Sequence, residues 1–492
     1  MMRTPRNPIG EPDRGLNAWL MRDGHKLAEC DCNIWLPRNA CDAGAIELGT
    51  FAFFMDFGGP LELKGASPDG WTVHATGVWI SSVSRGHGSE EKSTRSRIVV
   101  DHIDSLTVMR NIMTRPDREE VTNDDEPTEP GHLSFRLTDS RYVFIPEVRT
   151  LHSNGSIRVR RHRSMNLKHP MLGALRIDRH HHFSKGNNPH DTYITSQLAI
   201  EVRGKIRKNL ESLDNKTARA YVDDACLILS LAARHRVLVT GHTRYDHGVL
   251  ENTYDSPLQS LNPEASEYGW ELIGRSETIQ FLNHALARFA QLPEVEQRSI
   301  RHALYPLVPT RHPHLEESFV SMFSAFEGLL EPYREKKGIK HTVGTSRAWK
   351  AIEKKLRKVI NETDISDSTF NRSLMKARLP ELRHIPLHAV ANDYLKELKV
   401  PVDDLWPAFG SPGESATLYS IRNSLAHGEP MSDLIKPLSL AQFHLRILLE
   451  RIVLALLGWD IDKSNASPDR VKHHGYMGFE DFEKQRGMIR KE

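Results

Sequence analysis

Residues 318–333 read SFVSMFSAFEGLLEPY, and their apolar positions recur every three and four residues. This spacing places the apolar side chains on one face of a helix, which then has to pack against other elements. The residues that share this face are Phe319, Met322, Phe323, Phe326, Leu330 and Tyr333. Helical patterns dominate from about residue 296 to 460. We therefore expect residues 296–460 to form an all-α bundle of amphipathic helices.

Glu327 lies on the same predicted face, four residues after Phe323. A bare carboxylate among apolar side chains is energetically costly, so Glu327 should have a partner or an altered pKa. A structural ion pair and a catalytic role both satisfy this expectation, and the spacing alone does not choose between them.

The half of the chain before the bundle has a different pattern. From about residue 46 to 200 it consists of short runs rich in β-branched and aromatic residues, such as WTVHATGVWI (71–80) and LSFRLTD (133–139). Runs of this kind, bounded by turn-forming residues, are typical of strands. Residues 1–45 carry scattered Pro and Gly and are predicted to be irregular.

These patterns predict an α+β multidomain chain. Helical patterns and one short possible strand, RVLVTG, follow the β-rich region, and the C-terminal end is polar and expected to pack loosely or not at all. The predicted parts are a β-rich domain over 1–200, a helical connector over 201–295, the bundle over 296–460 and a polar tail over 461–492.

Composition restricts the class of protein. With 66 Lys and Arg against 64 Asp and Glu, the net charge of +2 gives no bulk attraction for nucleic acid, so any binding of it requires a local patch. Four cysteines are too few for a disulfide scaffold. We see no signal peptide and no apolar stretch suited to a membrane span, and therefore expect a cytoplasmic protein without membrane contact.

The sequence SATLYSIRNSLAH (415–427) predicts a helix that buries Leu418, Ile421 and Leu425. Gly428 follows at once, with Pro430 beyond it, and this pairing is a helix stop. A histidine at position 427 therefore lies at the helix C-terminus, where the negative end of the dipole favours imidazolium.

Asn423 is four residues before His427 and close enough to orient its ring. Arg422 points about 100° away from Asn423 around the helix. It converges with His427 only if the helix end bends or a second chain contributes.

The Arg-x4-His spacing occurs four times in this chain, at Arg97/His102, Arg176/His181, Arg383/His388 and Arg422/His427. The spacing alone is therefore a poor signal, and context has to discriminate. Only the last pair has Asn directly after the Arg, Gly directly after the His, and a hydrophobic helix following.

The string RNSLAHG (422–428), downstream of SFVSMFSAFEGLLEPY, resembles the HEPN superfamily, and more narrowly its Apea-like members. The resemblance covers residues 296–460 and implies a HEPN-like helical bundle. It also implies a metal-independent endoribonuclease that needs no cofactor, with an Arg-x4-6-His motif and a homodimer whose two copies form a composite active site. A β-rich region before such a bundle is similar to ApeA-type antiphage proteins, which act by abortive infection and respond to a phage-derived trigger.

Metal-independent RNA cleavage uses the 2′-OH of the substrate as the nucleophile. His427 suits proton transfer near neutral pH, and Arg422 suits stabilisation of the phosphorane charge. Asn423 would hold the His427 ring, and Glu327 would tune His427 or orient Arg422.

A basic stretch over 334–358 holds ten Lys or Arg against two Glu. Trp349, Ile352 and Leu356 are expected to form its buried stripe. The remaining charges then either face water or bind RNA phosphates, with tRNA among the candidate substrates. The candidate RNA-binding residues are Lys336, Lys337, Lys340, Arg347 and Lys350.

Two rival functions remain open on the sequence. A HEPN-like bundle can be non-catalytic and bind nucleotide, RNA or a partner protein. A ribonuclease toxin with a separate antitoxin would be lethal when expressed alone, whereas a triggered effector would be tolerated until its trigger appears.

We predict no metal site. Cys30, Cys32 and Cys41 do not have the paired spacing of zinc ligands and are interpreted as free thiols. The histidines at 180–182 are interpreted as part of a polar loop.

Overall fold

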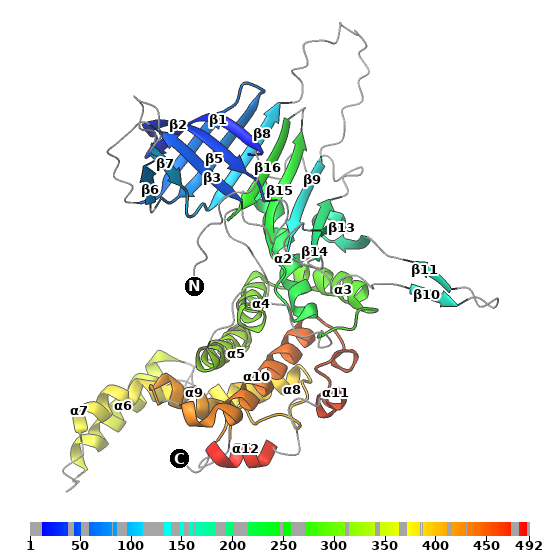
Figure 1. Cartoon of the computed structure of the whole chain (residues 1–492). Helices are drawn as coiled ribbons and strands as arrows, with labels where there is room; N and C mark the ends of the chain where they lie inside the picture. The colour runs from blue at the N-terminus through cyan, green and yellow to red at the C-terminus, as the bar shows by residue number, and fades with distance from the viewer. Residues whose placement is uncertain are drawn as a thin grey trace. The chain divides into compact units, whose positions relative to one another are not determined.

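A computed structural model of the chain (Figure 1) divides it into two compact units, Met1–Leu286 and Ala287–Glu492. The first unit is rich in strands and the second is helical, as the predicted α+β class requires. The structure describes residues 12–37, 44–50, 59–80, 82–85, 96–111, 132–138, 148–151, 157–160, 164–183, 192–200, 215–246, 249–256, 271–309, 314–339, 345–363, 371–383, 385, 387–410, 416–429, 431–473 and 482–489.

One antiparallel sheet organises the first unit. Its strands lie in the order β12-β13-β14-β9-β15-β16-β8-β5-β4-β1-β2-β3-β7-β6, and β10 and β11 form a separate two-stranded ribbon. The strands are β1 (Arg14–Arg22), β2 (His25–Trp35), β3 (Ala45–Thr50), β4 (Leu61–Ala66), β5 (Trp71–Val78), β6 (Ser82–Arg85), β7 (Ser96–Val99), β8 (Ser105–Asn111), β9 (His132–Leu137), β10 (Val148–Leu151), β11 (Ile157–Arg160), β12 (Ser164–His169), β13 (Gly173–Phe183), β14 (Thr192–Ile200), β15 (Val239–Asp246) and β16 (Val249–Asp255).

Alternation of apolar and polar residues explains why these segments are strands. In β1, Leu16, Ala18 and Leu20 are buried while the residues between them are more exposed. Successive side chains of a strand point to opposite faces, so one face of β1 enters the core. Cys30 and Cys32 occupy the same kind of inward position on β2, and burial raises the pKa of the Cys30 thiol to about 12.

Two predictions for this unit differ from the structure, one wholly and one in part. The segment predicted to be irregular over 1–45 contains β1 and β2, which pair with each other in the sheet. The predicted connector over 201–295 was expected to be helical with one possible short strand, RVLVTG, and β15 begins within that stretch; β16 was not predicted, and both strands lie between β9 and β8. The helices of this segment are α2 (Asn215–Ala233) and α3 (Thr278–Gln291).

The histidines at 180–182 also differ from the sequence interpretation. They belong to the end of β13, where His180 pairs with Thr195 and His182 with Tyr193 across the ladder to β14. The run is therefore strand rather than loop. Cys41, the remaining cysteine of the N-terminal group, lies outside the described residues.

The second unit is helical throughout its described part. The long α10 is central to it, with the side chains of most of its residues buried, as its nearly all-round apolar sequence predicts. The helices are α4 (Glu294–Leu307), α5 (Leu315–Lys337), α6 (Ser346–Glu362), α7 (Arg372–Arg378), η1 (Leu379–Arg383), α8 (Leu387–Glu397), α9 (Leu418–Ala426), η2 (Ser432–Leu434), α10 (Ile435–Leu456), η3 (Ile461–Lys463), α11 (Pro468–Lys472) and α12 (Phe482–Ile489).

Arg451 lies inside this unit and is fully buried. It donates from Nη1 and Nη2 to the two carboxylate oxygens of Asp404 at 2.7 Å each, and from Nε to the carbonyl of Ala466 at 2.7 Å. The carboxylate and the carbonyls satisfy a guanidinium that would otherwise be costly to bury.

The predicted loose packing of the tail was wrong for its described part. Helix α12 packs against α10, and Gln485 and Arg486 are buried there. Arg486 donates from Nε to the carbonyl of Ala416 at 3.2 Å, just before α9 begins. Part of the tail is therefore packed against the unit, with Gln485 and Arg486 buried.

Candidate functional site

The candidate site is built on α9, whose ends are fixed by local hydrogen bonds. At its start, the Thr417 side chain accepts from the Ser420 amide at 3.0 Å, and the Ser420 hydroxyl accepts from the Thr417 amide at 2.8 Å. This reciprocal capping box satisfies two amides that the helix leaves free. Leu418 and Ile421 are buried and anchor the helix to the unit.

The other end of α9 stops where the sequence predicts. His427 is the C-cap residue, and Gly428 follows with a φ of +80°. The amide of Gly428 donates to the carbonyl of Leu425, and the amide of Glu429 donates to that of Ser424. Glycine adopts this left-handed conformation without steric cost, which is why the chain turns here.

Arg422 meets Glu327, which comes from α5. The Nη2 atom of Arg422 lies 3.4 Å from Oε2 of Glu327, and both side chains are 30% exposed. The expectation that Glu327 has a partner is therefore confirmed. Both side chains are partly exposed, so the ion pair is only partly buried.

Asn423 also contacts Arg422, because its Oδ1 accepts from Nη1 of Arg422 at 3.2 Å. The predicted role of Asn423 in holding the His427 ring is therefore not what the structure shows. Within the described residues, no side chain hydrogen-bonds to the imidazole of His427, which is exposed to solvent. The site thus consists of a held arginine and an open histidine at the end of one helix.

A depression of about 490 Å³ opens beside the end of α9. Its lining from α5 includes Glu316 and Glu317, and Gly428 and Glu429, which follow α9, line its other side. The carboxylate of Glu316 already accepts a hydrogen bond, from the Met431 amide to Oε1 at 3.1 Å. A neutral amide does not cancel the charge of a carboxylate, so all three glutamates make the depression negative, which repels phosphates and attracts cationic groups.

The candidate RNA-binding residues are only loosely related to this site. Lys336 lies nine residues after Glu327 on α5, which is about 14 Å along the helix axis. Nζ of Lys337 forms an ion pair with Glu397 at 2.8 Å, and this hydrogen bond raises the pKa of Lys337. Its charge is therefore already partly neutralised.

Arg347 and Lys350 are exposed on α6, a helix that packs against α7 and η1, and Lys340 lies outside the described residues. The prediction of a buried stripe on α6 is confirmed only in part. Trp349 is buried but Ile352 is 40% exposed.

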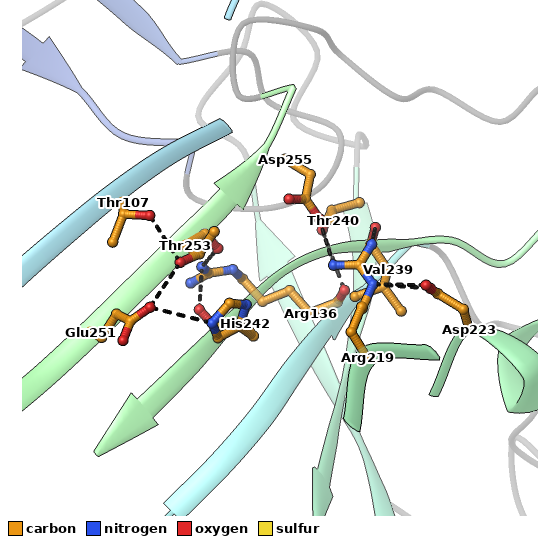
Figure 2. Close-up of polar contacts among 10 residues, drawn as sticks. All are labelled: Thr107, Arg136, Arg219, Asp223, Val239, Thr240, His242, Glu251, Thr253 and Asp255. Carbon is orange, nitrogen blue, oxygen red and sulfur yellow. Dashed lines mark hydrogen bonds and ion pairs between the residues drawn. The ribbon is translucent and has the colours of Figure 1, made fainter. Parts of the chain in front are cut away.

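Sequence analysis missed a polar network in the first unit, drawn in Figure 2. Arg136 of β9 donates to the carbonyls of His242 and Thr253, on β15 and β16, and its guanidinium lies 3.9 Å from the ring centre of Tyr254. Burial lowers the pKa of Arg136. Because its partners come from strands more than 100 residues away, no local spacing could have indicated the cluster.

The same network extends along β16, whose residues Glu251, Thr253 and Asp255 share one face of the strand. At one end of the strand, Arg219 of α2 pairs with Asp223 and with Asp255, whose Oδ2 lies 2.6 Å from its Nη1 (Figure 2). Nearer the other end, Nε2 of His242 lies 3.6 Å from Oε1 of Glu251, and this contact lowers the pKa of Glu251. The contacts tie α2 and three strands together, which is a structural role.

Comparison with known protein families, with characterised proteins and with solved structures found no significant match. Within the described residues, no cluster of His, Cys, Asp and Glu has the arrangement of a metal site. Over the same residues, no helix combines the length and apolar character needed to cross a bilayer. The function therefore has to be argued from the geometry of the site.

Proposed function

We propose that the helical unit is a HEPN-like, metal-independent endoribonuclease whose reaction depends on Arg422 and His427. The observation that supports this proposal is the open imidazole of His427 at the C-terminus of α9, one and a half turns after an arginine that Glu327 holds in place. The two residue types supply a proton-transfer group and a fixed positive charge, which are the groups that this reaction requires.

In the proposed reaction, the 2′-OH of the substrate attacks the adjacent phosphorus and the 5′-oxygen leaves. An imidazole accepts the proton of the 2′-OH, and a protonated imidazole donates one to the leaving oxygen. The product carries a 2′,3′-cyclic phosphate. Arg422 stabilises the negative charge on the phosphorane, and Glu327 and Asn423 keep its guanidinium oriented.

A second copy of the chain completes this mechanism. One α9 provides one histidine, whereas the reaction uses one acid and one base. In a homodimer the two copies of His427 share these roles. Arg422 and His427 point in different directions around one helix. In a dimer, the residues of one copy can act together with those of the other.

The biological setting rests on the sequence resemblance. In this proposal the protein is a cytoplasmic antiphage effector of the abortive-infection kind, and the sheet-containing unit restrains it until a phage component appears. Fold-level analogy of this kind is associational, so the setting is tested separately from the chemistry.

A second candidate, a non-catalytic binding module, is favoured by a specific observation. Two contacts already occupy the guanidinium of Arg422, and three glutamates line the depression beside His427. Such a surface suits a cationic partner group better than a phosphate.

The decisive experiment incubates the purified full-length chain with total RNA and with tRNA in EDTA, followed by mapping of the cleaved ends. We expect cleavage with 2′,3′-cyclic phosphate ends, and loss of nearly all activity in His427→Ala, since one acid/base group contributes about 10²–10⁴-fold. His388→Ala is the matched control, because Arg383 and His388 have the same spacing and His388 is exposed on α8.

Two results would contradict the ribonuclease. Cleavage that EDTA abolishes would indicate metal-dependent chemistry, and cleavage that survives His427→Ala would remove the proposed acid/base group. If the triggered system is equally harmless with wild-type chain and with His427→Ala, the binding module becomes the better account.

A further inference from the structure

The segment formed by α6, α7 and η1 exposes an unusual set of apolar side chains. Five large aliphatic residues of this segment are between 40% and 59% exposed. They are Ile352, Val359, Leu374, Met375 and Leu382. Scattered apolar residues are normal on a surface, but a concentration of them within one short segment marks an interaction site.

The segment packs mainly on itself. Helix α6 contacts α7 and η1, and the buried side chains of Trp349, Ile360 and Leu379 form its small core. Two hydrogen bonds close it, from Arg383 to the Ser346 hydroxyl at 3.3 Å and from Arg372 to the Thr363 carbonyl at 2.9 Å. Figure 1 shows α6 and α7 in yellow, running side by side.

The apolar stripe of α6 is wider than the surface that its neighbours cover. On a helix with about 100° per residue, Trp349 and Ile360 fall at nearly the same angle, and both are buried. Ile352 and Val359 fall about 60–80° to one side of Trp349, and both are exposed. One edge of the stripe is thus packed inside the segment and the other edge faces outward.

The charge around this exposed edge is positive. The described residues of 345–363 and 371–383 hold ten Lys and Arg against three Glu. Two of the glutamates are already paired, Glu353 with Arg357 at 2.7 Å and Glu362 with Lys358 at 3.7 Å. With Asp364 and Asp367 included, the whole of 345–383 holds ten Lys and Arg against five Asp and Glu, so the segment has a positive net charge.

Two of these cations lie beside the exposed apolar residues. Lys355 is three residues after Ile352 and four before Val359, and Arg378 is four residues after Leu374, so each shares a helix face with them. Neither Lys355 nor Arg378 forms an ion pair within the described part of the chain.

We propose that the exposed apolar side chains of this segment, Ile352, Val359, Leu374, Met375 and Leu382, bind an acidic amphipathic helix of a partner protein together with Lys355 and Arg378. The aliphatic side chains would cover the apolar face of that helix, and the two cations would pair with its carboxylates. Met375 adds a side chain that adapts to different apolar partners.

Charge and chemistry argue against the other occupants. A second copy would bring two strongly positive segments together, and like charges repel. RNA offers phosphates to the cations but little to cover five aliphatic side chains. A membrane interface favours exposed aromatic residues, whereas the single aromatic residue in the described part of the segment, Trp349, is buried. The proposal is independent of the ribonuclease reaction.

The test uses two fluorescein-labelled helical peptides of about 21 residues with leucines at the same heptad positions. One carries glutamate and the other lysine at the remaining positions, and binding to the full-length chain is followed by fluorescence anisotropy. We expect the glutamate peptide to bind and the lysine peptide not to bind. The double variant Val359→Ser and Leu374→Ser should weaken binding at least tenfold.

Ile435→Ser is the matched control, because Ile435 is an equally apolar side chain, 65% exposed, at the start of α10. It should bind like the wild type. The double variant Lys355→Glu and Arg378→Glu should reverse the preference, so that the lysine peptide binds. This reversal is a gain of binding, which a misfolded variant cannot produce.

Three results would overturn the proposal: no binding of the glutamate peptide, equal binding of both peptides, or binding that Val359→Ser and Leu374→Ser leave unchanged. Parallel arms use phosphatidylcholine vesicles with phosphatidylserine and a 20-nucleotide RNA. If either of these binds in place of the glutamate peptide and depends on Val359 and Leu374, the occupant is lipid or RNA and the proposal fails.

Discussion

Arg422 and Glu327 join two helices at residues 95 positions apart in sequence, with Nη2 of the arginine 3.4 Å from Oε2 of the glutamate. The contact is long for a charged hydrogen bond, and among the described residues Nε of Arg422 is buried with no hydrogen-bond partner. We predict that Glu327 acts mainly by orienting the guanidinium of Arg422.

A pair of substitutions at Glu327 tests this positioning. Glu327→Gln keeps an oxygen that can accept from Arg422, so RNA cleavage should stay within about threefold of wild type. Glu327→Ala removes the acceptor and should lower kcat about tenfold or more, with a smaller change in KM. Equal loss in both variants would mean that the negative charge, and not the orientation, is required.

The fold was predictable where periodicity is local. The face of Phe319, Phe323 and Phe326 is buried as its spacing requires, and the helix stop at Gly428 is where the sequence indicates. The central position of β15 and β16 in the sheet was not predictable, because ladder partners such as Thr253 and Thr107 are far apart in sequence. Strand pairing is a tertiary property that no window of residues contains.

For the candidate site, sequence reasoning predicted one contact and missed others. The need of Glu327 for a partner followed from its place on an apolar face, and Arg422 supplies that partner. The rotation of Asn423 toward Arg422 could not be derived, since a helix places Asn423 within reach of both neighbours. The acidic lining of the depression was also not predictable from the sequence, because it combines residues of α5 with residues that follow α9.

The buried pair of Arg451 and Asp404 should be important for the stability of the helical unit. Arg451→Met leaves Asp404 buried without its partner, and we expect a loss of about 3–5 kcal/mol in the free energy of unfolding. Hydrogen–deuterium exchange of α10 peptides should rise accordingly. Arg298→Met is the control, because its pair with Glu294 is exposed and should contribute little. Equal exchange in both variants would show that the buried pair is dispensable.

Gly241 lies in β15 at the point where Arg136 crosses toward β16. Its φ is +150°, and a Cβ at this position would lie 2.1 Å from the carbonyl oxygen of Thr253. Gly241→Ala should therefore separate β15 from β16 and destabilise the first unit by at least about 2 kcal/mol. Faster amide exchange in the two strands would report the change.

The control for Gly241→Ala is Gly274→Ala, because a Cβ at Gly274 would meet nothing within 4 Å and the backbone is not strained there. Its exchange should match that of the wild type. A Gly241→Ala chain with unchanged protection of β15 and β16 would show that the strands adjust without cost.

His444 makes the helical unit sensitive to acid. It is fully buried, its Nδ1 accepts from the Trp406 amide at 2.9 Å, and burial lowers its pKa to about 4. Nearby Asp404 raises this pKa and Arg451 lowers it, both by less than burial does. The native state therefore keeps this imidazole neutral at pH values where an unfolded chain, with a histidine pKa of about 6.5, binds a proton.

Because the unfolded state binds more protons between these two pKa values, stability falls as the pH decreases from about 6.5 to about 4, by up to about 3 kcal/mol. His444→Gln retains an acceptor for the Trp406 amide but cannot be protonated. Thermal unfolding of wild type and variant at pH 7.5 and pH 5 should show a smaller pH-dependent decrease in the variant. An identical decrease in both chains would assign the acid sensitivity to other groups.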